Sequence, residues 1–122
     1  MAAASILVVD DDPDTCACMS DVIADLGYQV EVAYAGPAAL VLFKRQSYAL
    51  ALLDFKLPGM NDVQLCRHLK QGRAKMVGIL VTAFASSETI IDASEAGMRQ
   101  VIPKPLNFAY LIPIIKEVAG EA

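Results

Sequence analysis

Short apolar runs alternate along this chain with longer segments in which apolar residues recur every three or four positions. Short runs bounded by polar or turn residues are typical of strands in a parallel sheet, and the longer period is typical of helices that pack on such a sheet. We therefore expect an α/β domain built from repeated strand–helix units. The expected strands are Ser5–Val9, Gln29–Ala33, Ala49–Leu53, Val77–Val81 and Arg99–Ile102.

Caps and turn residues mark where the helices should begin and end. Asp12 followed by Pro13 is an N-cap with proline in the first turn, and Gly27 should end the helix that starts there. Pro113 lies inside the last helical pattern, where it should kink that helix or delay its start. The other helices are expected from Gly36-Pro37 to Lys44 or Gln46, after the Pro58-Gly59 turn, from Ser86-Ser87 to Gly97, and from Asn107 to about Ala119.

The connections between these elements are short, which favours one compact domain over residues 1–122. Right-handed crossovers then give a doubly wound (βα)5 fold, with helices on both faces of a five-stranded parallel sheet. The expected strand order is 2-1-3-4-5, an arrangement called flavodoxin-like. This order places the first and third strands side by side, so that Asp10, Asp11 and Asp54 become neighbours at one edge.

Composition excludes several classes of protein. With 56% hydrophobic residues the chain is not expected to be disordered, and its net charge of −4 without a basic stripe argues against direct nucleic-acid binding. No apolar run approaches a membrane span, and charge begins too early for a signal peptide. Cys16, Cys18 and Cys66 lack metal-site spacing and indicate reduced thiols in a cytoplasmic protein. On a helix, Cys16 and Cys18 should point to different faces.

The expected strands end in residues with a shared chemistry. Asp10, Asp11 and Asp54 supply carboxylates, Thr82 a hydroxyl and Lys104 an ammonium. Clustered carboxylates repel one another, and a hard divalent cation such as Mg2+ relieves that repulsion. A carboxylate beside magnesium can attack phosphorus, and fixed cations and donors stabilise the transferring group. Each residue alone has a simpler explanation, such as a strand end or a surface lysine. Their joint placement favours a phosphoryl site.

At these residues the sequence resembles the response-regulator receiver domains of two-component signalling, in particular stand-alone chemotaxis regulators. The resemblance covers about residues 5–119. It rests on the combination Val9-Asp10-Asp11, Leu53-Asp54, Pro58-Gly59, Thr82-Ala83 and Lys104-Pro105.

The resemblance implies a role for each acid of the cluster. Asp54 matches the phosphoacceptor. Asp11 matches the acid that binds magnesium directly, and Asp10 the acid that holds it mainly through water. The backbone carbonyl of Lys56 matches the third protein ligand. Asp12 is interpreted as a helix N-cap, not as a ligand.

The resemblance also implies how the domain would switch. Thr82 matches a hydroxyl that bonds to one phosphoryl oxygen, and Lys104 matches the lysine that pairs with another. In this family the Lys104–Pro105 peptide is typically cis. Val101 stands where the family often has an aromatic residue, and with Pro113 it departs from the usual pattern of the output face.

The implied partners are a sensor histidine kinase or a histidine phosphotransfer protein, and a downstream protein target. The chain would catalyse only its own phosphorylation and dephosphorylation, as a monomer or weak dimer, without binding nucleic acid or membrane. Two alternatives stay open. One is a small phosphatase of the haloacid-dehalogenase type, with Asp10–Asp12 as its D-x-D motif; the other is a receiver-like docking module that is not phosphorylated.

Overall fold

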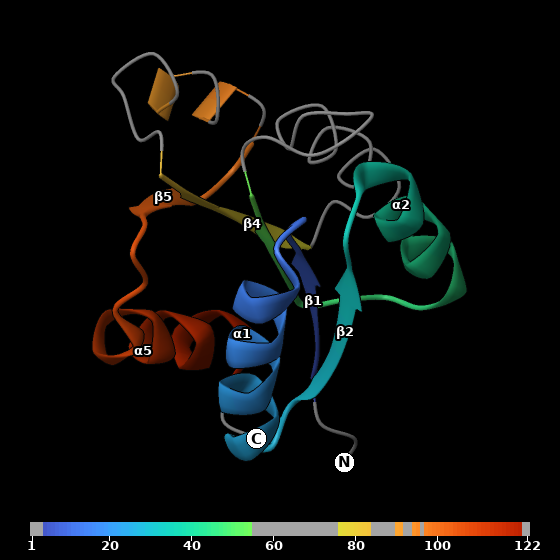
Figure 1. The fold of residues 1–122 in the computed structure, drawn as a ribbon, viewed down its shortest axis with the longest axis horizontal. Helices are drawn as coiled ribbons and strands as arrows, with labels where there is room; N and C mark the ends of the chain where they lie inside the picture. The colour runs from blue at the N-terminus through green and yellow to red at the C-terminus, as the bar shows by residue number, and fades with distance from the viewer. Residues whose placement is uncertain (1–3, 55–75, 84–89, 92–93, 96, 121–122) are drawn as a thin grey trace.

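Five parallel strands form a single sheet in the order β2-β1-β3-β4-β5, as the sequence predicted (Figure 1). The computed structural model describes residues 4–54, 76–83, 90–91, 94–95 and 97–120. The first two strands have the predicted bounds; the other three differ by one residue at one or both ends. The strands are β1 (Ser5–Val9), β2 (Gln29–Ala33), β3 (Leu50–Leu53), β4 (Val77–Thr82) and β5 (Gln100–Pro103).

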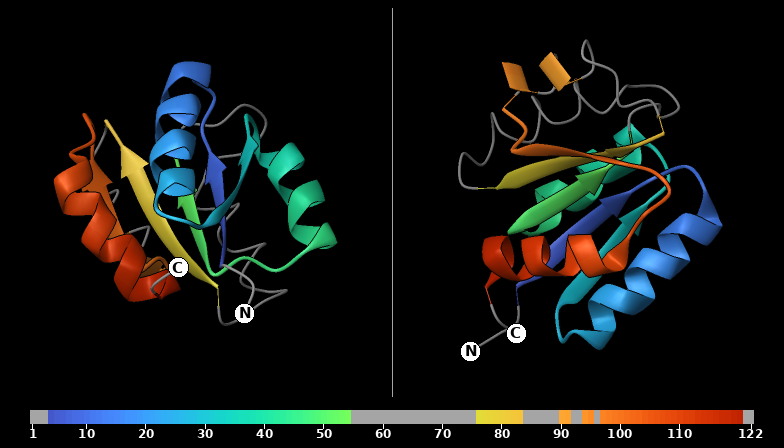
Figure 2. Two further views of the ribbon diagram at one scale, coloured as in Figure 1. Left: turned by 90° about the horizontal axis from the view of Figure 1, so that it is seen from below. Right: turned by 90° about the vertical axis from the view of Figure 1, so that its left-hand side faces the viewer.

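Alternate residues of each strand face opposite sides of the sheet, so the core has two halves. Figures 1 and 2 show α1 (Pro13–Asp25) and α5 (Phe108–Ala119) on one face and α2 (Gly36–Arg45) on the other. On β1, Ile6 and Val8 pack toward α1 and α5, whereas Leu7 and Val9 pack in the half of the core that α2 covers. β3 is buried along its whole length, as expected for a central strand.

Helix α1 begins where the sequence predicted. Asp12 is its N-cap, with Pro13 at the first helical position. Cys16, Met19 and Ile23 recur at three and four residues and are buried against the sheet. Burial of large apolar side chains such as Met19 and Ile23 is worth about 1.5–3 kcal/mol each. The helix therefore presents a fixed N-terminus to the edge of the sheet where β1 ends.

Helix α5 is also capped as predicted, since the Asn107 side chain accepts a 3.0 Å hydrogen bond from the N–H of Ala109. Leu111 and Ile115 anchor it in the core. Of the two effects expected of Pro113, a kink or a delayed start, the delayed start is wrong, because the helix runs through this residue from Phe108. Pro113 is exposed, so its ring lies on the solvent side of the helix.

Two predicted helices fall wholly or partly outside the described residues. The third, after the 58–59 turn, lies outside them, as does the Ser86 cap of the fourth. Residues 90, 91, 94 and 95 of the fourth are helical, as expected. Within the described part of the chain, no helix has the length and apolar character needed to cross a membrane.

Candidate functional site

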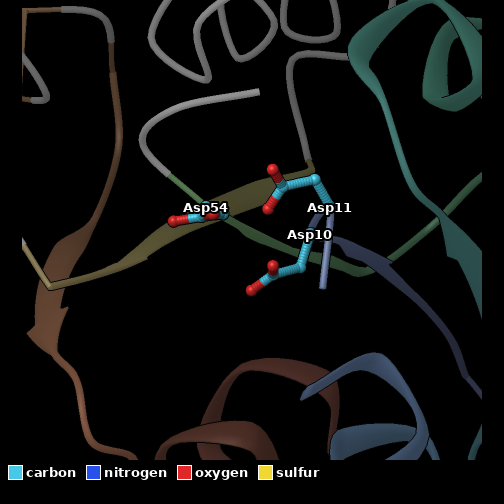
Figure 3. Close-up of side chains that lie close together, drawn as sticks. All are labelled: Asp10, Asp11 and Asp54. Carbon is cyan, nitrogen blue, oxygen red and sulfur yellow. The ribbon is translucent and has the colours of Figure 1, made fainter. Parts of the chain in front are cut away.

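Three carboxylates meet where β1 and β3 end. Asp10 and Asp11 follow β1, and Asp54 follows β3. The two strands are paired in parallel, and the N–H of Asp54 donates a 2.9 Å hydrogen bond to the carbonyl of Val9. One carboxylate oxygen from each acid lies within 4.8 Å of the others, and Figure 3 shows the three side chains together. The predicted acidic cluster is therefore present.

Asp10 is held in place by several hydrogen bonds. Its side chain is buried, and both of its carboxylate oxygens accept hydrogen bonds. Oδ1 accepts from the N–H of Asp12 at 2.9 Å, and Oδ2 accepts from Nζ of Lys104 at 2.8 Å. The N–H of Asp10 donates to the carbonyl of Ala33 at 3.1 Å. The Asp10 carboxylate is thus held by a backbone N–H and by the Lys104 ammonium.

Lys104, which follows β5, brings the cation to this edge. Its N–H donates to the carbonyl of Thr82 at 2.7 Å, and Nζ lies 2.8 Å from Asp10 Oδ2 and 3.6 Å from Asp54 Oδ1. Burial acts to lower the pKa of this ammonium, but the hydrogen bond to Asp10 and the charges of Asp10 and Asp54 outweigh it and raise the pKa above its usual value. Lys104 is therefore protonated at physiological pH. Its peptide bond to Pro105 is cis.

Asp12 has the structural role that the sequence predicted. It is exposed, and its side chain accepts from the N–H of Asp14 at 3.2 Å and from Oγ1 of Thr15 at 2.7 Å. The hydrogen bond from Thr15 lowers the pKa of the Asp12 carboxyl and outweighs the opposing effect of desolvation. Asp12 therefore caps α1.

Thr82 is buried at the end of β4, level with Pro103 of β5. Because Leu53 is level with Leu80, Thr82 lies one residue further along the strands than the level of Asp54. Its carbonyl accepts from Lys104, so the backbones of these two site residues are directly joined. Lys56, the remaining predicted ligand, lies outside the described residues.

A groove opens to solvent beside Lys104. It has a volume of about 270 Å³ and lies between α1 and the segment that follows β5. Its lining residues are Thr15, Cys18, Lys104, Pro105, Leu106 and Phe108. The Lys104 side chain is thus accessible from solvent through this groove, and most of the other residues that line the groove are apolar.

The model of the response regulator receiver domain family matches residues 6–116. The chain belongs to this family. The receiver domain is 33% identical over 103 residues to the transcriptional regulatory protein ZraR of Salmonella typhimurium, which covers 84% of this chain. The chain spans only 23% of that protein's length. The family assignment leaves no support for the haloacid-dehalogenase alternative.

Solved structures agree on the fold of this receiver domain. A CheY-like response regulator receiver domain protein from Methanospirillum hungatei has a TM-score of 0.91 and 34% identity, with 95% of this chain and 93% of that chain covered. The DrrB receiver domain in its BeF3-activated form has a TM-score of 0.87 and 27% identity, with 95% and 97% covered. The similarity to both extends over nearly the whole domain.

The donor set of the receiver domain fits a hard divalent cation. All three potential ligands are carboxylates, and Mg2+ prefers oxygen. With Mg–O distances of about 2.1 Å, the oxygens that bind one Mg2+ lie about 3–4 Å apart. The three carboxylate oxygens here lie within 4.8 Å of one another, so only small side-chain movements would bring them to those distances. Asp11 is exposed and Asp54 partly exposed, whereas both oxygens of buried Asp10 already accept hydrogen bonds. The exposed Asp11 carboxylate is thus more accessible to a cation than the buried Asp10 carboxylate.

One contact at the site was missed by sequence reasoning. The sequence predicted that Cys16 and Cys18 point to different faces of α1, and this is confirmed, with Cys16 buried and Cys18 exposed. It did not predict that the Cys16 thiol donates a 3.2 Å hydrogen bond to the carbonyl of Asp10. Burial raises the pKa of this thiol to about 11, so it is a neutral donor at physiological pH. The helical spacing of Cys16 was the only sequence signal for this contact. It predicts which way the side chain points but not which atom it bonds to.

Proposed function

We propose that this receiver domain accepts a phosphoryl group on Asp54 as part of a two-component phosphorelay. The observation that carries the proposal is the position of the Lys104 ammonium, 3.6 Å from Asp54 in a cluster of three acids. A transferring phosphoryl group spreads negative charge over its equatorial oxygens, and a fixed cation beside the attacking oxygen stabilises that charge. The family assignment supports the same reaction.

The reaction needs only one nucleophile from this chain. A carboxylate oxygen of Asp54 attacks the phosphorus of a phosphohistidine on the partner. The new O–P bond forms as the P–N bond breaks, and the electron pair stays on the imidazole nitrogen. Lys104 pairs with one phosphoryl oxygen, and the hydroxyl of Thr82 donates to another. Lys104 must turn only from Asp10 toward Asp54, since it already lies within 4 Å of both.

Magnesium, when bound, would neutralise charge on the transferring group. We assign Asp11 and Asp54 as its direct protein ligands, together with the carbonyl of Lys56. Asp10 would hold it through water, since both Asp10 oxygens already accept hydrogen bonds. Asp10 also keeps Lys104 at the site.

The phosphodonor in this proposal is a sensor histidine kinase or a histidine phosphotransfer protein, and the output is a changed surface for a downstream protein. Exposed apolar side chains near β5 offer such a surface: Ile90, Ile91 and Tyr110. We expect a cytoplasmic monomer or weak dimer that contacts neither nucleic acid nor membrane directly. Its catalysis is confined to its own phosphorylation and dephosphorylation.

Intact-mass spectrometry tests the proposal. The protein is incubated with magnesium and phosphoramidate, which supplies a phosphoryl group on nitrogen. Wild type should gain the mass of one phosphoryl group, and Asp54→Asn should gain none. Asp21→Asn is the matched control, because Asp21 is an exposed acid on α1 outside the cluster; it should behave as wild type.

An absent mass gain in wild type, with folding intact, would contradict phosphoacceptor chemistry and favour the docking-module alternative. A gain that persists in Asp54→Asn would show that another residue is the acceptor. Release of inorganic phosphate from simple phosphate esters would instead indicate a phosphatase.

A further inference from the structure

Cys16 is the residue that joins α1 to the acidic cluster. Its thiol is 1% exposed and donates to the carbonyl oxygen of Asp10 at 3.2 Å. That carbonyl belongs to the peptide that links Asp10 to Asp11. Because a peptide is planar, holding its carbonyl also restricts the direction in which the next residue leaves it. The Cys16 hydrogen bond therefore restrains the position of the Asp11 Cα atom, to which the side chain is attached.

Cys16 also holds the backbone on the C-terminal side of Asp11. The backbone N–H of Cys16 donates to the carbonyl of Asp12 at 3.1 Å, while its thiol bonds to Asp10. The sheet holds Asp10 through Ala33, and the N–H of Asp12 bonds to the Asp10 carboxylate. Cys16 thus fastens both sides of Asp11 to a helix that is itself packed in the core.

Asp11 depends on this support more than its neighbours do. It is exposed, and no hydrogen bond or ion pair among the described residues holds its carboxylate. Asp10 is fixed by Lys104, and Asp12 is fixed by Thr15. Among the described contacts, those that restrain Asp11 act on its backbone, and Cys16 supplies two of them.

We propose that Cys16 is a positioning residue for the Asp11 carboxylate, and that the magnesium affinity of the cluster depends on its thiol hydrogen bond. This inference rests on the metal assignment of the proposed function. It concerns the unphosphorylated protein, so magnesium affinity can be measured without a phosphodonor.

Magnesium titrations followed by amide NMR signals test the inference with three variants. Cys16→Ala removes the donor, and its dissociation constant should rise about tenfold, the low end for outer-shell partners because a thiol is a weak donor. Cys16→Ser keeps a donor and should stay within about threefold of wild type. Ile23→Val trims another buried side chain of α1 away from the cluster; it should lower the melting temperature and leave affinity unchanged.

The comparison separates positioning from general stability. Equal weakening in Cys16→Ala and Cys16→Ser, or equal weakening in Ile23→Val, would overturn the role of the hydrogen bond. Wild-type affinity in Cys16→Ala would overturn it as well.

Failure of this inference differs from failure of the proposed function. If wild type is phosphorylated on Asp54 but Cys16→Ala binds magnesium normally, only the role of Cys16 is wrong. If Cys16→Ala loses magnesium affinity but wild type gains no phosphoryl group, Cys16 positions Asp11 and the phosphoacceptor proposal is wrong. A wild-type protein that binds no magnesium overturns the metal assignment and the inference with it.

Discussion

The ammonium of Lys104 lies 2.8 Å from a carboxylate oxygen of Asp10, 94 residues away in the chain. The pair joins the ends of β5 and β1, two strands that are separated in the sheet by β4 and β3. It therefore spans the edge of the sheet and passes beside Asp54, which lies 3.6 Å from the same ammonium. In this state the cation of the chain itself offsets the repulsion within the acidic cluster.

The first prediction concerns folding without metal. Lys104→Met should lower the free energy of unfolding in chelator by about 1–2 kcal/mol, because it leaves the buried Asp10 carboxylate without its cation. The expected loss is below that of a fully buried pair, since the Lys104 side chain is 22% exposed. Urea unfolding measures it, with the exposed Lys116→Met as control. Equal stability of Lys104→Met and the control would show that the pair does not stabilise the fold.

The second prediction concerns the same variant with metal. Lys104→Met should bind magnesium more tightly than wild type, because a positive charge near the cation has been removed. Magnesium should also recover most of the stability that the variant loses in chelator, since ligand binding to the folded state stabilises it. Calorimetry and unfolding at saturating magnesium give both quantities. Weaker binding in Lys104→Met would mean that Lys104 organises the site and does not compete with the cation.

The third prediction separates two adjacent acids. Asp11→Asn should weaken magnesium binding at least about tenfold, because it removes a charged ligand. Asp12→Asn removes a neighbouring charge but keeps a good N-cap, so its affinity should change little. Magnesium titrations of the two variants under one set of conditions give the comparison. Equal losses would indicate a general charge effect, and the assignment of Asp11 as a direct ligand would then be withdrawn.

Most of the fold could be predicted from the sequence because buried parallel strands and capped helices leave strong local signals. Asp12-Pro13 located the start of α1, and Asn107 located the start of α5. Pro113 does not delay the start of α5, and its exposed ring lies on the solvent side of a helix that is anchored in the core. Here Leu111 and Ile115 supply that anchor.

The members of the acidic cluster could be predicted from the sequence, but the contacts that they make could not. Strand order alone brings Asp10, Asp11 and Asp54 to one edge. The Lys104 ammonium contacts one acid more closely than another because of side-chain conformation and burial. The spacing of residues along the sequence does not determine either of these. The thiol bond from Cys16 to Asp10 was missed for the same reason.

The fourth prediction is a pH dependence with a defined sign. Burial, followed by the charge of Asp10, raises the pKa of the Cys16 thiol from 9.0 to about 11. Between these values the folded protein keeps a proton that the unfolded chain has released, so the free energy of unfolding falls as pH rises. Over this range wild type should lose about 1–2 kcal/mol more than Cys16→Ser, which does not titrate there. Chemical denaturation at stepped pH measures the difference, and parallel curves would contradict it.

The central claim is that Asp54 carries the phosphoryl group, and the most direct measurement locates that group chemically. Borohydride reduces an aspartyl phosphate to homoserine, which peptide mass spectrometry identifies by position. After treatment with magnesium and phosphoramidate, wild type should contain homoserine at position 54 and at no other aspartate, and untreated protein should contain none. Homoserine at position 10 or 11, or none in protein that has gained a phosphoryl group, would contradict the account.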